Sequence, residues 1–171
     1  MKILMVIAPK RYREEEFEIP AKAFLNAGVS FDVASTKTGI CEGMVGGEQE
    51  ASLLISDASE ENYDGIVIVG GLGASDFLWK EEPLVELVKQ FYEKDKVVGA
   101  ICLAPVVLAR AGILKDKQAT VFETPASVEL LKQGGANIVK VPVVSDNNII
   151  TANHPTAAEG FADIVLEKLG C

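Results

Sequence analysis

Residues 97–112 have the sequence VVGAICLAPVVLARAG, in which one apolar run leads through a cysteine into a second. Val97–Ile101 carries no charge, which is typical of a strand buried on both faces of a parallel sheet. Leu103–Ala111 predicts a helix that ends near Gly112. Cys102 lies between the two, so the segment predicts a sharp strand-to-helix turn that carries a thiol.

The same alternation of short apolar runs and amphipathic stretches continues along the chain. Further strands are predicted at Ile3–Ile7, Val29–Ala34, Gly65–Val69, near Ala119–Phe122, at Val139–Val144 and at Asn148–Thr151. Further helices are predicted at Glu16–Asn26, Pro83–Tyr92, Ala126–Gln133 and Pro155–Leu169. The segment Thr38–Ala51 is rich in Gly and Glu, and we expect a surface excursion with a small hairpin there. This order indicates an α/β fold with a mostly parallel central sheet covered on both faces, in a single domain of residues 1–171.

The charge balance argues against some partners. The net charge is −9, from 25 acidic and 16 basic residues, whereas binding of phosphates requires a basic surface. The apolar runs are too short to span a membrane, and the first one stops at Pro9 before a charged stretch, unlike a signal peptide. We therefore expect a cytoplasmic protein that binds neither nucleic acid nor membranes.

The cysteines and the histidine limit the metal chemistry. Cys41, Cys102 and Cys171 are an odd, sparse set, which fits a reducing compartment better than a disulfide framework. His154 is the only histidine, so a Cys/His zinc cluster is not expected. We expect no metal and no organic cofactor.

The spacing around Cys102 is that of a nucleophile elbow. Ala100 and Ala104 lie two residues before and after it, where small side chains let a strand and a helix approach closely. A thiol at a helix N-terminus would have a lowered pKa, which favours the reactive thiolate. A buried, inert cysteine explains the same pattern, and the spacing alone does not decide between the two.

A glycine-rich loop follows the predicted strand at 65–69. Gly70, Gly71 and Gly73 let the backbone come close to another group. The loop could direct an N–H group at an oxyanion, and the N–H of Leu103 would supply a second donor. A tight strand exit without a catalytic role is the simpler interpretation of the loop alone.

Acidic residues gather at the start of the first predicted helix. Glu14, Glu15, Glu16 and Glu18 are favoured there by the helix dipole, and most must be solvated. One of them could face Cys102, because both segments follow the carboxyl ends of strands. A carboxyl group in that place would be most useful when protonated, as a hydrogen-bond donor to the thiolate.

His154 lies between the last predicted strand and the last helix. It is the only candidate for a Cys–His pair. A loop or helix-capping role is an equally good interpretation.

Taken together, these segments resemble the PfpI/ThiJ family, which is similar to class I glutamine amidotransferases and includes the archaeal intracellular protease and the parkinsonism-linked deglycase. The matching features extend over essentially the whole chain. They are the glutamate region followed by Pro20 and Gly28, the VGG-G loop, the AIC elbow, the TVF strand and the IITANHP segment. The resemblance implies a flavodoxin-like three-layer sandwich that forms homodimers or larger homo-oligomers.

The resemblance also implies roles for individual residues. Cys102 matches the family's nucleophile, and Glu16 matches the glutamate that hydrogen-bonds the thiol, with Glu15 as the alternative. Gly71 and Leu103 match the amides of the oxyanion hole, and Gly70 lies beside them in the substrate-binding loop.

Two positions depart from the family pattern. Family peptidases carry a histidine directly after the nucleophile, where this chain has Leu103, so the resemblance to the peptidases is weaker. The deglycase branch often has Arg-Gly-Pro before the last helix, where this chain has Asn153, His154 and Pro155.

Three functions remain open at this point. The first is an enzyme of the glyoxalase III or protein deglycase type, in which Cys102 attacks a reactive carbonyl, free or carried on a protein. The second is an intracellular cysteine peptidase that uses His154 as its base. The third is a redox-sensing stress protein or chaperone whose thiol is oxidised.

Overall fold

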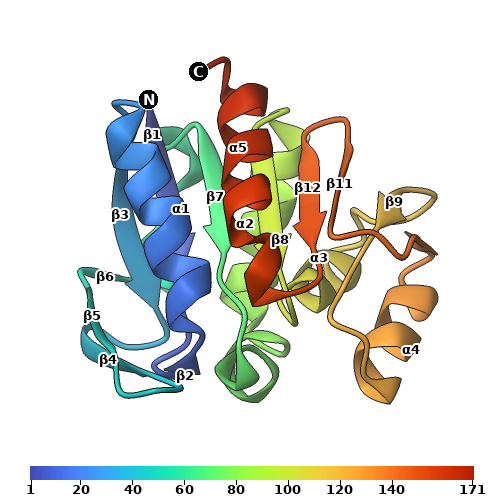
Figure 1. Ribbon diagram of the computed structural model, residues 1–171, viewed down its shortest axis with the longest axis horizontal. Helices are drawn as coiled ribbons and strands as arrows, with labels where there is room; N and C mark the ends of the chain where they lie inside the picture. Colours follow the sequence, from blue (N-terminus) through green and yellow to red (C-terminus); the bar gives the residue numbers. More distant parts are fainter.

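A seven-stranded sheet forms the centre of the computed structural model, which describes residues 1–171. From edge to edge its strands are β11 (Val143–Asp146), β12 (Ile149–Ala152), β8 (Val97–Ile101), β7 (Gly65–Ile68), β1 (Lys2–Val6), β3 (Ser30–Ser35) and β6 (Leu53–Leu54). All neighbours pair in parallel except β11, which runs antiparallel to β12 (Figure 1). The prediction of an α/β fold with a mostly parallel sheet is confirmed, and the strand order is flavodoxin-like.

Helices cover both faces of this sheet. They are α1 (Glu14–Asn26), α2 (Glu82–Glu93), α3 (Pro105–Arg110), α4 (Pro125–Gln133) and α5 (Ala158–Leu169). In Figure 1, α1 and α5 lie side by side in front of the sheet, whereas α2 and α3 lie behind it. None of the helices has the length and the apolar character that crossing a membrane requires.

The core explains why the apolar runs become central strands. Every residue of β7 and β8 is buried, as is β1 from Ile3 onward, because helices lie on both sides. Gly99 of β8 allows α5 to pack closely, since a Cβ there would lie 2.9 Å from Cζ of Phe161. The result is a rigid central sheet whose strand ends hold the loops described below.

The expected surface excursion is a small sheet of its own. β4 (Gly39–Gly43) and β5 (Glu48–Ala51) form an antiparallel hairpin, so this prediction is confirmed. A third strand, β2 (Lys10–Tyr12), pairs with β4 and was not predicted. This small sheet lies next to the N-terminal end of α1.

Some predicted boundaries are wrong. The strand expected near Ala119–Phe122 is only β9 (Gln118–Ala119), which pairs with β10 (Asn137–Ile138) in a separate sheet. Residues 120–122 join no strand ladder, because the N–H of Thr120 donates to the side-chain hydroxyl of Thr151 and that of Phe122 to the carbonyl of Cys102. The strand expected at Val139–Val144 begins at Val143, directly after a proline that lacks the N–H for a sheet ladder.

All five helix starts differ from the prediction by one to three residues, and two of these shifts affect the description of the site. The helix expected from Leu103 begins at Pro105, since residues 102–104 form the turn itself. The helix expected from Pro155 begins with a 3₁₀ turn at Pro155–Ala157 before α5 starts at Ala158. The first of these shifts places the thiol outside the helix, which affects its electrostatics.

Candidate active site

Cys102 occupies a strained turn at the carboxyl end of β8. Its φ is 64°, a left-handed conformation that few residues other than glycine adopt. Its N–H donates to the carbonyl of Ala152 over 2.8 Å, and its own carbonyl accepts the N–H of Phe122 over 2.8 Å. Ala100 and Ala104 on either side are fully buried. The geometry is therefore that of the elbow that the spacing predicts.

Glu16 is buried beside this thiol. The residue is 0 % exposed, and its Oε2 accepts the N–H of Gly70 over 2.8 Å, while its Oε1 has no hydrogen-bond partner. A Cβ on Gly70 would lie 2.6 Å from Oε2 of Glu16 and 2.8 Å from Cβ of Cys102. The carboxyl group and the Cys102 side chain thus both lie against the same face of Gly70.

Burial raises the pKa of Glu16 to about 8, more than its contacts with Cys102 and Gly70 lower it. The carboxyl group is therefore mostly protonated at neutral pH. In that form it can donate a hydrogen bond, and its negative charge is absent from the site.

Burial also raises the pKa of the Cys102 thiol, and the charge of an ionised Glu16 raises it further, to about 12, whereas the N–H groups of Gly71 and Leu103 lower it. The prediction that a helix N-terminus lowers the pKa of this thiol is wrong. The helix α3 begins only at Pro105, and the effect of burial on the pKa exceeds that of the backbone N–H groups. When Glu16 keeps its proton, its charge no longer opposes the thiolate. Formation of the thiolate is therefore coupled to the protonation of Glu16.

Two backbone N–H groups face the sulfur. They belong to Gly71 and Leu103, the pair for which the sequence predicts an oxyanion hole. Gly71 has φ 99°, and a Cβ there would lie 2.6 Å from the backbone nitrogen of Arg13, so only glycine fits. The carbonyl of Leu103 accepts Nε1–H of Trp79 over 2.8 Å, a support that the sequence pattern did not indicate.

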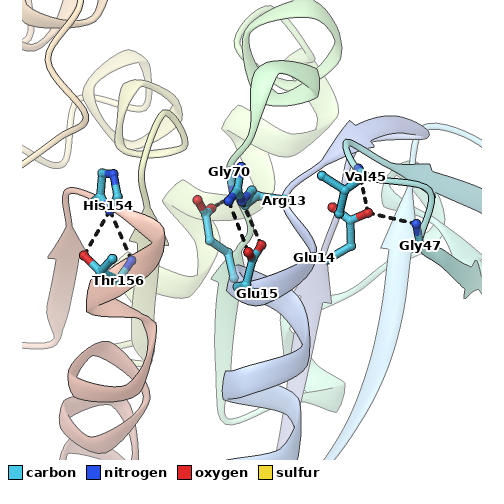
Figure 2. A network of polar contacts seen from close by, with 9 residues as sticks. Arg13, Glu14, Glu15, Val45, Gly47, Gly70, His154 and Thr156 are labelled. Atoms are coloured by element: carbon cyan, nitrogen blue, oxygen red, sulfur yellow. Dashed lines mark hydrogen bonds and ion pairs between the residues drawn. The ribbon is translucent and has the colours of Figure 1, made fainter.

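The other two glutamates of the first turn of α1, Glu14 and Glu15, have other partners (Figure 2). The side chain of Glu15 is 43 % exposed and pairs with Arg13, so this carboxylate is directed to the surface rather than to the buried thiol. Glu14 is buried, and its Oε2 accepts the N–H groups of Val45 and Gly47 over 2.9 and 2.8 Å. Of the three carboxyl groups in the first turn, the geometry brings only that of Glu16 to Cys102.

His154 lies on the rim of the same cavity. Its Nδ1 accepts the N–H of Thr156 over 3.2 Å and lies 3.0 Å from the Oγ1 of that residue (Figure 2). The ring stacks on Phe122 with centroids 6.0 Å apart. The capping interpretation of this histidine is confirmed, and its position on the cavity wall leaves Nε2 as the nitrogen that a substrate could meet.

The cavity at Cys102 has a volume of about 170 Å³. Its wall includes Arg13 and a set of side chains that are mostly apolar, Met44, Leu72, Phe122 and Pro155. Sequence reasoning missed these residues, because the hairpin and the loops that carry them meet only in the folded chain. The volume is below the roughly 300 Å³ at which pockets for drug-sized ligands begin, so it suits a small molecule or the end of a side chain.

A larger hollow of about 630 Å³ lies elsewhere and is lined by Tyr92, Glu93, Asp95, Lys96, Asn147, Asn148 and Lys168. These residues lie at the amino ends of β8 and β12, whereas ligands of open α/β sheets bind at the carboxyl ends. The smaller cavity at Cys102 has the nucleophile and is the better candidate for an active site.

Comparisons with known proteins find relatives over nearly the whole chain. Residues 1–168 match the model of the DJ-1/PfpI family. The chain is 49 % identical to an uncharacterized protein of Methanocaldococcus jannaschii over 98 % of this chain and 82 % of that protein. It is 28 % identical to a deglycase of Thermococcus kodakarensis over 91 % of each. The crystal structure of a ThiJ/PfpI domain protein from Brachyspira murdochii superposes with a TM-score of 0.94 at 34 % identity, over 99 % of this chain and 96 % of that chain.

Proposed function

Because the chain belongs to the DJ-1/PfpI family, we propose that it is a cysteine-dependent enzyme that acts on reactive carbonyls, of the glyoxalase III or protein deglycase type. The observation that carries the proposal is the strained Cys102 at φ 64°, flanked by a buried Glu16 and faced by two backbone N–H groups. The relative from Thermococcus kodakarensis supports the deglycase type by its name.

The first step on a 2-oxoaldehyde would be addition of the Cys102 thiolate, whose proton has passed to solvent water. The sulfur of Cys102 forms a C–S bond to the aldehyde carbon, and the aldehyde oxygen becomes an oxyanion. The N–H groups of Gly71 and Leu103 stabilise this oxyanion, and the carboxyl group of Glu16 gives it a proton. The product is a hemithioacetal beside a carboxylate.

The second step would move hydrogen within the substrate. The Glu16 carboxylate takes the C–H proton of the former aldehyde carbon and returns it to the adjacent ketone carbon, while the hydroxyl proton of the hemithioacetal moves to the ketone oxygen. This gives a thioester with a neighbouring hydroxyl group. Water then cleaves the thioester, so the net reaction is 2-oxoaldehyde plus water to 2-hydroxy acid. No external oxidant enters this balance. Where the carbonyl is carried as an adduct on a protein amine, the amine leaves when the C–S bond replaces the C–N bond.

Conversion of methylglyoxal to lactate tests the proposal. We expect wild type to form lactate and Cys102→Ala to lose at least about 10²-fold of the rate, because the covalent step is gone. Cys171→Ala is the matched control, since this exposed cysteine lies away from the cavity, and it should keep the wild-type rate. Equal rates for wild type and Cys102→Ala would reject the proposal.

Peptide hydrolysis is the second candidate, favoured by the position of His154 on the same cavity wall as Cys102. It requires that casein or peptide cleavage be lost in both Cys102→Ala and His154→Ala, whereas lactate formation should not need the histidine. Peptide cleavage that survives His154→Ala would rule out His154 as the base assigned to this reaction. The absence of a histidine directly after the nucleophile makes this the weaker candidate.

A further inference from the structure

We propose that Arg13 forms a carboxylate-binding subsite in the Cys102 cavity, so that the preferred carbonyl substrates carry an acidic group. For turnover the proposal rests on the proposed function, but the binding of an anion beside Cys102 does not. The two observations behind it are the place of Arg13 in the cavity wall and the way its side chain is held.

Arg13 is fixed at both its backbone and its side chain. Its backbone N–H donates to the carbonyl of Gly70 over 3.1 Å, so it is tied directly to the oxyanion loop. Its Nε and Nη2 donate to Oε2 and Oε1 of Glu15 over 2.7 and 3.1 Å (Figure 2). The guanidinium therefore has a set orientation before any ligand arrives, which lowers the entropic cost of binding.

The guanidinium also has donors that Glu15 does not use. A guanidinium presents a planar set of N–H groups, and the pair with Glu15 engages only the Nε edge and one part of Nη2. The N–H groups of Nη1 and the rest of Nη2 are left for a second carboxylate, which such an edge binds with two parallel hydrogen bonds. Glu15 reduces the net charge of Arg13, but both of its oxygens are already committed.

The remaining wall of the cavity fits the rest of such a substrate. Arg13 is the only lysine or arginine of the cavity, and its side chain is 31 % exposed, so it is only partly screened by solvent. Met44, Leu72 and Phe122 give an apolar surface in the same cavity. A cavity of about 170 Å³ suits a small substrate, whose carboxylate at Arg13 would lie close to its reactive carbon at Cys102.

Alkylation of Cys102 tests the subsite without assuming turnover. Iodoacetate and iodoacetamide have the same leaving group and nearly the same size, but only the first is an anion. The ratio of their rates at Cys102, read by mass spectrometry of its peptide, reports the preference for an anion. Both reagents react with the same thiolate, so a change in the thiol pKa cancels in the ratio.

We expect Arg13→Gln to lower this ratio about tenfold, the size of one charge-assisted hydrogen bond, and Arg13→Lys to give an intermediate value. Arg11→Gln is the matched control. Arg11 is also an arginine paired with a carboxylate, Asp76, but it does not line the cavity, so the ratio should stay at the wild-type value. A ratio that is equal in wild type and Arg13→Gln, or that falls equally in Arg11→Gln, would overturn the proposal.

Turnover provides the second readout. The acid 4,5-dioxopentanoate and its methyl ester share the 2-oxoaldehyde group and differ in the charge at the far end. We expect wild type to prefer the acid in kcat/KM and Arg13→Gln to lose about tenfold of that preference, mainly through KM. If wild type converts neither compound, the proposed function fails, and the alkylation ratio still decides for or against the subsite. If wild type converts the ester and the acid with equal kcat/KM, the carboxylate subsite is rejected, but the proposed enzymatic function is not.

Discussion

The N–H of Gly70 donates a 2.8 Å hydrogen bond to Oε2 of Glu16, across 54 residues of chain. This contact joins the loop after β7 to the first turn of α1 at the point where Cys102 leaves β8. The carbonyl of Gly70 accepts the N–H of Arg13 and strengthens the same junction. The geometry of the site therefore depends on close approach of three segments at one glycine.

Gly70→Ala should disrupt this junction. The new Cβ would lie 2.5 Å from the carbonyl oxygen of Ile101 and 2.6 Å from Oε2 of Glu16, so the backbone must move. We expect a loss of about 1–3 kcal/mol in the free energy of unfolding and a fall in Cys102 alkylation by iodoacetamide. Urea unfolding and the alkylation rate measure the two effects.

Gly160→Ala is the control for Gly70→Ala. Gly160 lies in α5, and the nearest atom to its new Cβ, on Val143, is 3.7 Å away, which is an ordinary contact. Alanine is also the better helix former, so stability should rise slightly and alkylation should not change. Equal behaviour of the two variants would show that the approach at Gly70 is not critical.

Glu16→Gln should change how stability depends on pH. Burial raises the pKa of Glu16 from 4.5 to about 8, so the folded state holds a proton that the unfolded state releases. Stability conferred on the folded wild type by this proton is therefore present below pH 4.5 and lost as the pH rises toward 8. Glutamine cannot ionise, so the variant should have a flatter profile, with a relative gain of up to about 4 kcal/mol at pH 8.

Chemical unfolding at a series of pH values measures this difference. Glu18→Gln is the control, because Glu18 is exposed on the same helix, and its profile should follow that of wild type. Alkylation adds a second readout. Above about pH 8 the charge of Glu16 should oppose formation of the Cys102 thiolate in wild type but not in Glu16→Gln. Identical alkylation profiles would therefore contradict the coupling between the ionisation of Glu16 and that of Cys102.

Much of the fold follows from local sequence, because buried parallel strands need continuous apolar runs. The strand Val97–Ile101 is predicted to the residue, and the small neighbours Ala100 and Ala104 indicate the elbow. Residues 120–122 have the same β-forming composition but form no strand, since the N–H groups of Thr120 and Phe122 bond to the Thr151 side chain and the Cys102 carbonyl rather than to a strand ladder. A local pattern does not contain that information.

The sequence alone cannot tell which carboxyl group faces the thiol. Glu14, Glu15 and Glu16 are identical side chains in consecutive helical positions, about 100° apart around the axis. Their directions lead to three different partners, the hairpin, Arg13 and the Gly70 loop. Only the tertiary position of those partners separates the roles, and the family resemblance rather than the local pattern indicates Glu16.

Trp79→Phe should weaken the site through the position of Leu103. The indole Nε1–H donates to the carbonyl of Leu103 over 2.8 Å, and the N–H of the same residue faces the sulfur. Phenylalanine keeps a ring of similar shape but has no donor. We expect kcat for methylglyoxal to fall roughly threefold to tenfold with little change in KM, the pattern of a lost interaction in the transition state. A change in KM alone would instead indicate that Trp79 acts through substrate binding.

Glu14→Gln should loosen the β4–β5 hairpin, which carries Met44 into the cavity wall. Although burial opposes ionisation, the N–H groups of Gly47 and Val45 lower the pKa of Glu14, so it is a carboxylate at neutral pH and holds the hairpin by charge-assisted hydrogen bonds. The neutral amide should cost about 1–2 kcal/mol of unfolding free energy and speed hydrogen exchange at Val45 and Gly47. The stabilisation is present above the ordinary pKa of glutamate and is lost as the pH falls through the lowered one, so wild type should approach the variant in acid.

Glu18→Gln again serves as the control for Glu14→Gln, because this glutamate is exposed on the same helix, and surface changes of this kind stay within about 0.5 kcal/mol. If the hairpin also shapes the cavity, Glu14→Gln should reduce the discrimination between 4,5-dioxopentanoate and larger 2-oxoaldehydes, since Met44 would no longer be held in place. Faster hydrogen exchange at Val45 and Gly47 with unchanged substrate discrimination would show that Glu14 holds the hairpin but that the hairpin does not set the substrate size. Exchange at the wild-type rate would show that the carboxylate of Glu14 does not hold it.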